Sequence, residues 1–120
     1  MSTQSNRIAF DQWLQLRTKF REEKRSNNYS RVIEISLQII ELEKSAKFIS
    51  IMAPIFLKEI GNAYIKLGDV LNAIKYYEQA LEGFIEYRAT AKLSQPDDWL
   101  KDTYLLEKKI LKLQSKPVTP

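Results

Sequence analysis

Apolar residues recur at spacings of three and four along most of this chain, which is the periodicity of an amphipathic α-helix. The pattern is clearest in residues 54–87, where two stripes consist of Leu57, Ile60, Gly61, Tyr64 and Leu67, and of Ala73, Ile74, Tyr77, Ala80 and Leu81. Between the stripes, Leu67-Gly68-Asp69 predicts a tight turn. We therefore predict a hairpin of two helices that approach most closely at the small residues Gly61 and Ala73, with the tyrosines filling the space between them.

The N-terminal part of the chain predicts a first helix over residues 8–24, after a polar segment 1–6 that we expect to be disordered. Its stripe repeats the spacing of Leu57, Ile60, Gly61 and Tyr64 with Trp13, Leu16, Arg17 and Phe20. Residues 21–28 contain no apolar side chain and predict a solvated helix end that leads into a turn at Ser26-Asn27-Asn28.

A second helix is predicted to begin near Ser30, a suitable N-cap, and to reach residue 46. Its residues Val32, Ser36 and Ile39 lie 41 positions before Ala73, Tyr77 and Ala80. A half-buried strand over residues 32–39 is an alternative, because isoleucine and leucine alternate there with polar residues. Helix is favoured, since a lone strand would have no partner strand for its backbone.

The remaining segments predict the ends of three helices. Pro54 belongs in the first turn of the third helix, where its missing N–H has no intrahelical partner to lose. The fourth helix is expected to continue to about Leu93. A last helix over residues 98–115 begins with an aspartate N-cap, and residues 116–120 form a disordered tail. The apolar stripe of that helix consists of Trp99, Thr103, Leu106, Ile110 and Leu113.

The two stripes of residues 54–87 resemble the tetratricopeptide repeat (TPR). The family pattern is matched by Leu57, Ile60, Gly61, Tyr64, Leu67, Gly68, Ala73, Tyr77 and Ala80. This resemblance implies an all-α superhelix of about five helices: a degenerate repeat over 8–46, a clear repeat over 54–87 and a capping helix over 98–115. The 41 residues from Val32 to Ala73 exceed the 34 of a standard repeat, so the chain resembles TPR-like proteins with a longer period.

The resemblance also implies where a partner binds. TPR proteins hold peptide segments against the concave face of their first helices, and the matching positions are Ile55, Lys58, Asn62, Ile65 and Lys66, with Tyr104 and Lys108 in the last helix. Lys58 followed by Asn62 is similar to the pair with which some TPR domains clamp a terminal carboxylate, through charge and directed hydrogen bonds. The implied partner is an acidic or carboxylate-bearing peptide of another protein.

Composition excludes several classes of function. The 120 residues are 44% hydrophobic and 28% charged, which suits one globular domain. There is no cysteine and no histidine, so thiolate metal sites, disulfides and the commonest general base are absent. We expect no enzymatic activity, no metal and no cofactor. Without an apolar run of 18 residues, we also expect a cytoplasmic protein that does not enter a membrane.

Two alternatives to a peptide-binding adaptor or chaperone-like module stay open. The isoelectric point of about 9.3 and net charge of +4 would suit a nucleic-acid-associated protein, although the basic residues are spread along the chain rather than gathered in one patch. The other is a structural scaffold that associates with itself and buries the open end of its own stack.

Overall fold

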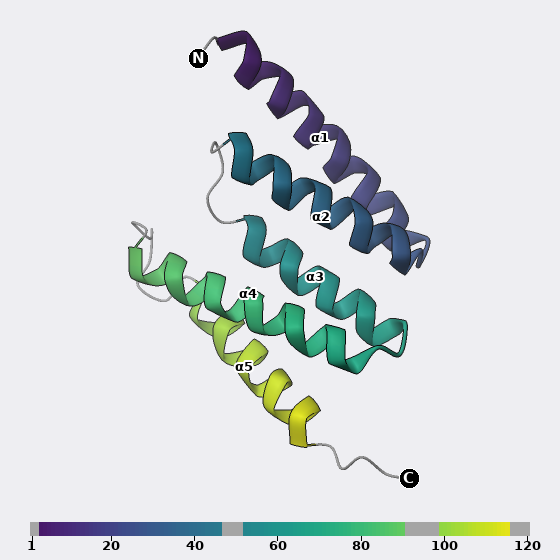
Figure 1. Ribbon diagram of the computed structural model, residues 1–120, viewed down its shortest axis with the longest axis vertical. Coiled ribbons are helices and arrows are strands. Elements are labelled where there is room, and N and C mark those ends of the chain that lie inside the picture. The colour runs from purple at the N-terminus through teal and green to yellow at the C-terminus, as the bar shows by residue number, and fades with distance from the viewer. Residues whose placement is uncertain (1–2, 47–51, 91–98, 116–120) are drawn as a thin grey trace.

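The computed structural model describes residues 3–46, 52–90 and 99–115, which form five helices and no strand. In chain order these are α1 (Thr3–Arg25), α2 (Tyr29–Ala46), α3 (Met52–Lys66), α4 (Val70–Thr90) and α5 (Leu100–Ser115) (Figure 1). The all-α prediction is confirmed. Residues 32–39 lie inside α2, so the strand alternative is wrong for that segment.

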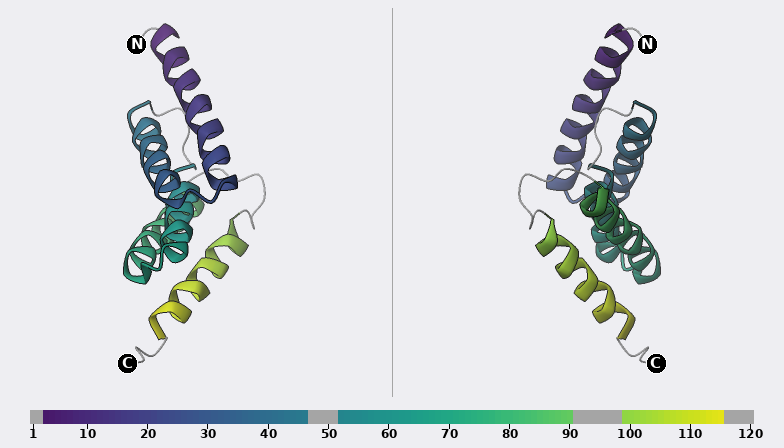
Figure 2. Two further views of the ribbon diagram at one scale, coloured as in Figure 1. Left: turned by 90° about the vertical axis from the view of Figure 1, so that its right-hand side faces the viewer. Right: turned by 90° about the vertical axis from the view of Figure 1, so that its left-hand side faces the viewer.

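Each helix packs on the next one along the chain, and the result is an elongated stack of 57 × 35 × 20 Å. Figure 2 shows α2 and α4 on one side of this stack, while α1 and α5 diverge on the other side. The helix α3 lies between α2 and α4 and contacts both of them. None of the helices in the described part of the chain is long and apolar enough to cross a membrane.

The core consists of two clusters that meet at α3. The first joins α1, α2 and α3 through Trp13, Phe20, Val32, Ile35, Ile39, Phe56 and Ala63, and the second joins α4 and α5 through Ala73, Tyr77, Ala80, Phe84, Leu106 and Ile110. Phe56 and Ala63 belong to the first cluster, while Leu57 and Tyr64 on the adjacent side of α3 pack against the second. Because α3 has two buried faces, it ties the halves of the stack together.

The predicted turn between α3 and α4 is confirmed. Gly68 has a φ of 81°, a left-handed conformation that glycine adopts without steric cost. The amide of Asp69 donates to the carbonyl of Tyr64 at 2.9 Å. The Asp69 carboxylate then accepts from the Asn72 backbone amide at 3.1 Å, so Asp69 caps the N-terminus of α4.

The close approach at Gly61 is confirmed, and a tyrosine of α4 fills the space beside it, as predicted. A Cβ atom on Gly61 would lie 2.5 Å from two ring carbons of Tyr77, whereas Ala73 is not among its nearest neighbours. The sequence pattern predicted that tyrosines fill this space, but it could not show which of them lies against Gly61. A second close approach joins Gly83 of α4 to the ring of Pro54. Pro54 lies in the first turn of α3, as expected.

Two of the predicted helix starts, those of α1 and α2, differ from the structure. The helix α1 already begins at Thr3, so the disorder predicted for residues 1–6 is wrong from that residue onward; no glycine or proline interrupts helix propagation there. The helix α2 begins at Tyr29, and the carbonyl of Asn28 rather than Ser30 accepts the first intrahelical bond, from Val32 at 3.0 Å. The predictions for Leu93, the aspartate N-cap of the last helix and the tail 116–120 lie outside the described residues.

The last helix has the predicted stripe, which faces α4. Its first carbonyl acceptor is Trp99, which has a φ of 65° and receives bonds from the amide and hydroxyl of Thr103. Trp99 stacks on Phe84 with ring centroids 5.6 Å apart. Trp99 and Leu106 follow Phe56 and Ala63 by 43 residues and play the same part, so α5 packs on α4 as α3 packs on α2.

Candidate functional site

Two cavities flank α3 and meet at Asn62, which lines both of them. One, of about 240 Å³, lies between α3 and the segment that joins α1 to α2, and its lining includes Lys24, Glu59 and Lys66. The other, of about 200 Å³, lies between α3 and α5, and its lining includes Lys58, Asp102 and Lys109. We call these two cavities together the α3 groove.

Asn62 is held in place by hydrogen bonds from α4 and α5. The hydroxyl of Tyr77 donates to its Oδ1 atom at 2.5 Å, and the Lys109 ammonium donates to the same atom at 3.3 Å. Burial, together with the nearby charge of Glu59, raises the pKa of Tyr77 to about 12, so its hydroxyl keeps its proton. The side-chain oxygen of Asn62 is therefore already bonded within the protein. The Asn62 amide is only partly available for the carboxylate clamp that the resemblance implies.

The charged side chains of the α3 groove are mostly cationic. Lys24 pairs with Glu59 at 2.8 Å, and the Lys58 ammonium lies 4.0 Å from a carboxylate oxygen of Asp102. The second pair is long and partly exposed, so it neutralises Lys58 only weakly. Lys66 has no ion pair or hydrogen bond within the described residues. Four lysines thus face two acids: Lys24, Lys58, Lys66 and Lys109 against Glu59 and Asp102.

The structure brings together some of the predicted site residues and separates others. Lys58, Asn62 and Lys66 line the α3 groove. Ile55 and Ile65 are partly buried against the second core cluster, which makes them packing residues as well. Tyr104 and Lys108 line neither cavity and contact each other instead, with the Lys108 ammonium 5.0 Å from the Tyr104 ring centroid.

The misplaced pair has a simple cause. The resemblance placed Tyr104 and Lys108 42 residues after Asn62 and Lys66, whereas the packing aligns Trp99 with Phe56, a shift of 43 residues. One residue turns an α-helix by about 100°, so the error moved the expected groove positions to another face of α5. The residues that do line the groove from α5 are Asp102, Leu105, Leu106 and Lys109.

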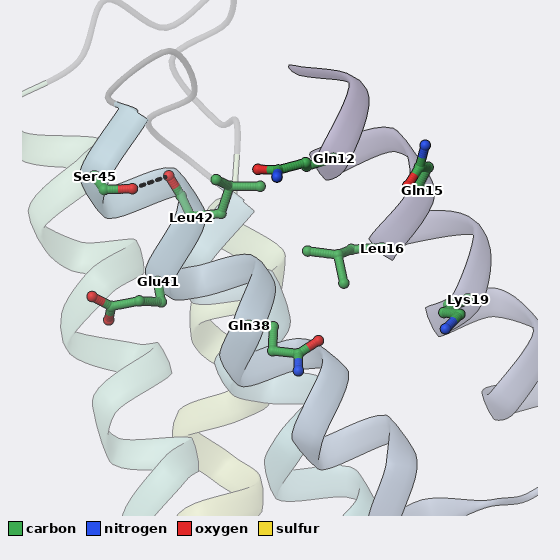
Figure 3. Close-up of a pocket in the computed structure, with 8 residues that line it drawn as sticks. All are labelled: Gln12, Gln15, Leu16, Lys19, Gln38, Glu41, Leu42 and Ser45. Atoms are coloured by element: carbon green, nitrogen blue, oxygen red, sulfur yellow. Dashed lines mark hydrogen bonds between the residues drawn. The ribbon is translucent and has the colours of Figure 1, made fainter. Parts of the chain in front are cut away.

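A third cavity, of about 530 Å³, lies between α1 and α2 at the N-terminal end of the stack. Figure 3 shows Gln12 and Leu16 of α1 directed toward Leu42 of α2 across this space. Apart from the two leucines its lining is polar, with Gln12, Gln15, Lys19, Gln38, Glu41 and Ser45.

Glu43 is a buried carboxyl group that the sequence analysis did not single out. Its side chain is 4% exposed, and the indole N–H of Trp13 donates to its Oε2 atom at 3.0 Å. Burial raises the pKa of Glu43 to about 7, while the Trp13 bond and the charge of Arg17 act in the opposite direction. The bond between Trp13 and Glu43 is a polar contact between α1 and α2. Among the described residues, no group of three or more acidic side chains could hold a metal ion.

No family model, no curated protein and no solved structure matches this chain. The TPR resemblance therefore stays an interpretation that rests on the residues themselves.

Proposed function

We propose that this protein is an interaction module of TPR type, an adaptor or chaperone-like scaffold that binds an acidic peptide segment of a partner in the α3 groove. The observation that carries the proposal is the group of four lysines around Asn62, which outnumber the two acids among them. A carboxylate of the partner would gain charge-assisted hydrogen bonds there.

Lys66 and Lys109 are the best candidates for the main contacts. They lie on opposite sides of Asn62, one in each cavity, and both are exposed. Lys24 and Lys58 already have carboxylates within 4.0 Å, so a ligand would compete with Glu59 and Asp102 for them. Leu105, which is 52% exposed, offers the ligand an apolar contact beside Lys109.

The proposal is tested with two fluorescent ten-residue peptides, one alternating leucine with glutamate and one alternating leucine with glutamine. We expect the acidic peptide to bind at least tenfold more tightly in an anisotropy titration, about 1.4 kcal/mol, and to weaken at 0.5 M salt. The double substitution Lys66→Glu with Lys109→Glu should abolish this preference. Lys44→Glu is the matched control, since Lys44 is an exposed lysine on α2 that lines neither cavity.

Equal affinities for the two peptides, or an acidic preference that survives the double substitution, would contradict the proposal. A single-stranded oligodeoxynucleotide serves as a competitor in the same titration. If it displaced the peptide and bound more tightly, the nucleic-acid alternative would replace the peptide one. Asn62 is left unchanged in these variants, because Asn62→Ala would remove the hydrogen-bond partner of the buried Tyr77 and cost about 1–3 kcal/mol of stability.

A further inference from the structure

The helix α5 has a second apolar stripe that no other helix in the described part of the chain covers. Leu100, Tyr104 and Leu111 lie four and seven residues apart, which places them on one line along the helix. They are 43%, 52% and 60% exposed, and none of them belongs to the core cluster that joins α5 to α4 or to the contacts that Asp102 and Lys109 make with α3. We call these three residues, together with exposed Glu107 between them, the outer stripe of α5.

The position of the outer stripe matches a face of α3 that is covered. With the 43-residue shift that aligns the packing of the two helices, Leu100 and Tyr104 correspond to Leu57 and Gly61. Leu57 packs in the second core cluster, and Gly61 lies against the ring of Tyr77 from α4. The outer stripe is therefore the surface of α5 on which a further helix would lie if the arrangement of α3 and α4 were repeated.

The charges beside the outer stripe indicate what kind of helix fits. Lys101, Lys108 and Lys112 are exposed and lie seven and four residues apart, so they form a row along one side of the stripe. Antiparallel pairing of two copies of α5 about a two-fold axis would bring the two lysine rows together, which opposes self-association. A helix with acidic residues along the facing side would instead pair with the row.

We propose that the outer stripe of α5 is a docking surface for an amphipathic helix of a partner protein, one with an apolar stripe flanked by acidic residues. Where α3 has Gly61 and receives a tyrosine ring, α5 presents Tyr104, so the partner helix has a small residue at that point. Glu107 favours a hydrogen-bond donor opposite it and so sets the register. The surface is separate from the α3 groove, because Tyr104 and Lys108 line neither cavity.

The test uses a synthetic 21-residue helix of alanine, leucine and glutamate with one leucine stripe, and a matched helix with lysine in place of glutamate. Titrated into the isotope-labelled full chain, the acidic helix should shift the backbone amide resonances of residues 100–112 and bind at least tenfold more tightly than the basic helix. Leu111→Glu should weaken it at least tenfold. Leu71→Glu, the same change at an 83% exposed leucine of α4, should have no effect.

Lys66→Glu with Lys109→Glu should leave the shifts around Tyr104 in place, so this surface and the α3 groove are tested independently. Circular dichroism of each variant confirms that the helices are intact. The proposal is overturned if the acidic helix shifts only α3 resonances, shifts none, or binds no better than the basic helix. It is also overturned if sedimentation shows a dimer of the chain that Leu111→Glu dissolves, since the occupant would then be a second copy.

Discussion

The two ends of this stack expose faces of opposite character, although each is formed by a helix in the same structural position. At the N-terminal end, Gln12 and Lys19 of α1 stand 44 residues before Phe56 and Ala63, the positions where α3 packs on α2. At the C-terminal end, the face of α5 that corresponds to the α4-contacting side of α3 carries Leu100 and Tyr104. This face of α1 is polar, whereas the corresponding face at the C-terminal end is apolar; elsewhere α1 also exposes Ile8, Phe10 and Leu14.

This difference shows how one helix pattern serves two purposes. A repeat stack needs a polar outer face where it ends, and the glutamines of α1 supply one. An apolar stripe at the opposite end costs solubility unless something covers it, which is why we place a docking surface there and not in the larger cavity between α1 and α2. The same asymmetry continues inside the stack, where equivalent positions of the two halves differ in size and polarity.

The largest difference between the halves is expected at Gly61 and Arg17, which occupy equivalent positions 44 residues apart. Gly61→Leu would force its side chain into the ring of Tyr77, which is fully buried, and should destabilise the fold by roughly 3 kcal/mol. Arg17 is partly exposed over the Trp13 ring, so Arg17→Leu should cost at most about 1 kcal/mol. Urea unfolding of both variants measures this; equal losses would show that the halves pack alike.

The next effect concerns Glu43 and the pH dependence of the N-terminal half. Because folding raises the pKa of this carboxyl group from 4.5 to about 7, the folded state holds the proton more tightly. Its contribution is most favourable below pH 4.5 and is lost as the pH rises through 7, by up to about 3 kcal/mol. Unfolding free energies at pH 5 and pH 8 should therefore differ less in Glu43→Gln than in the wild type.

The control for this prediction is Glu41→Gln, at an exposed position on the same helix, which should keep the wild-type pH dependence. If Glu43→Gln also kept it, the carboxylate would be ionised at no cost in the folded state. The contact between Trp13 and Glu43 would then tolerate a negative charge. The polar character of the N-terminal end would in that case reach from its surface to this buried position.

The smallest expected difference in stability is between substitutions of Tyr77 and Ser36. These residues lie 41 positions apart in equivalent places of the two halves. Tyr77→Phe removes the hydroxyl that bonds Asn62 and should cost about 1 kcal/mol. The buried Ser36 hydroxyl has no hydrogen-bond partner among the described residues, so Ser36→Ala should be neutral or slightly stabilising. Thermal unfolding distinguishes the two; a loss at Ser36 as large as at Tyr77 would mean that its hydroxyl is bonded.

Much of the fold could be predicted from residue spacing, because burial of one helix face leaves a local trace in the sequence. The stripes containing Val32, Ser36 and Ile39, and Ala73, Tyr77 and Ala80, are buried as expected. The groove could be predicted only in part: Lys58, Asn62 and Lys66 follow from their place on α3, while Lys109 and Asp102 depend on how α5 is rotated. A single-residue difference in register decides that rotation, and spacing alone does not resolve it.

The sequence by itself determined five helices, the glycine turn at Gly68 and the sides of α2, α3 and α4 that are buried, because these depend on neighbours within a few residues. Only the tertiary structure decided which tyrosine fills the space at Gly61, that Glu43 is buried beside Trp13, and that the last helix exposes Leu100 and Tyr104. Each of those contacts joins residues far apart in the chain, or leaves one without a partner. Whether a side chain meets another helix or water depends on the packed arrangement of all five helices.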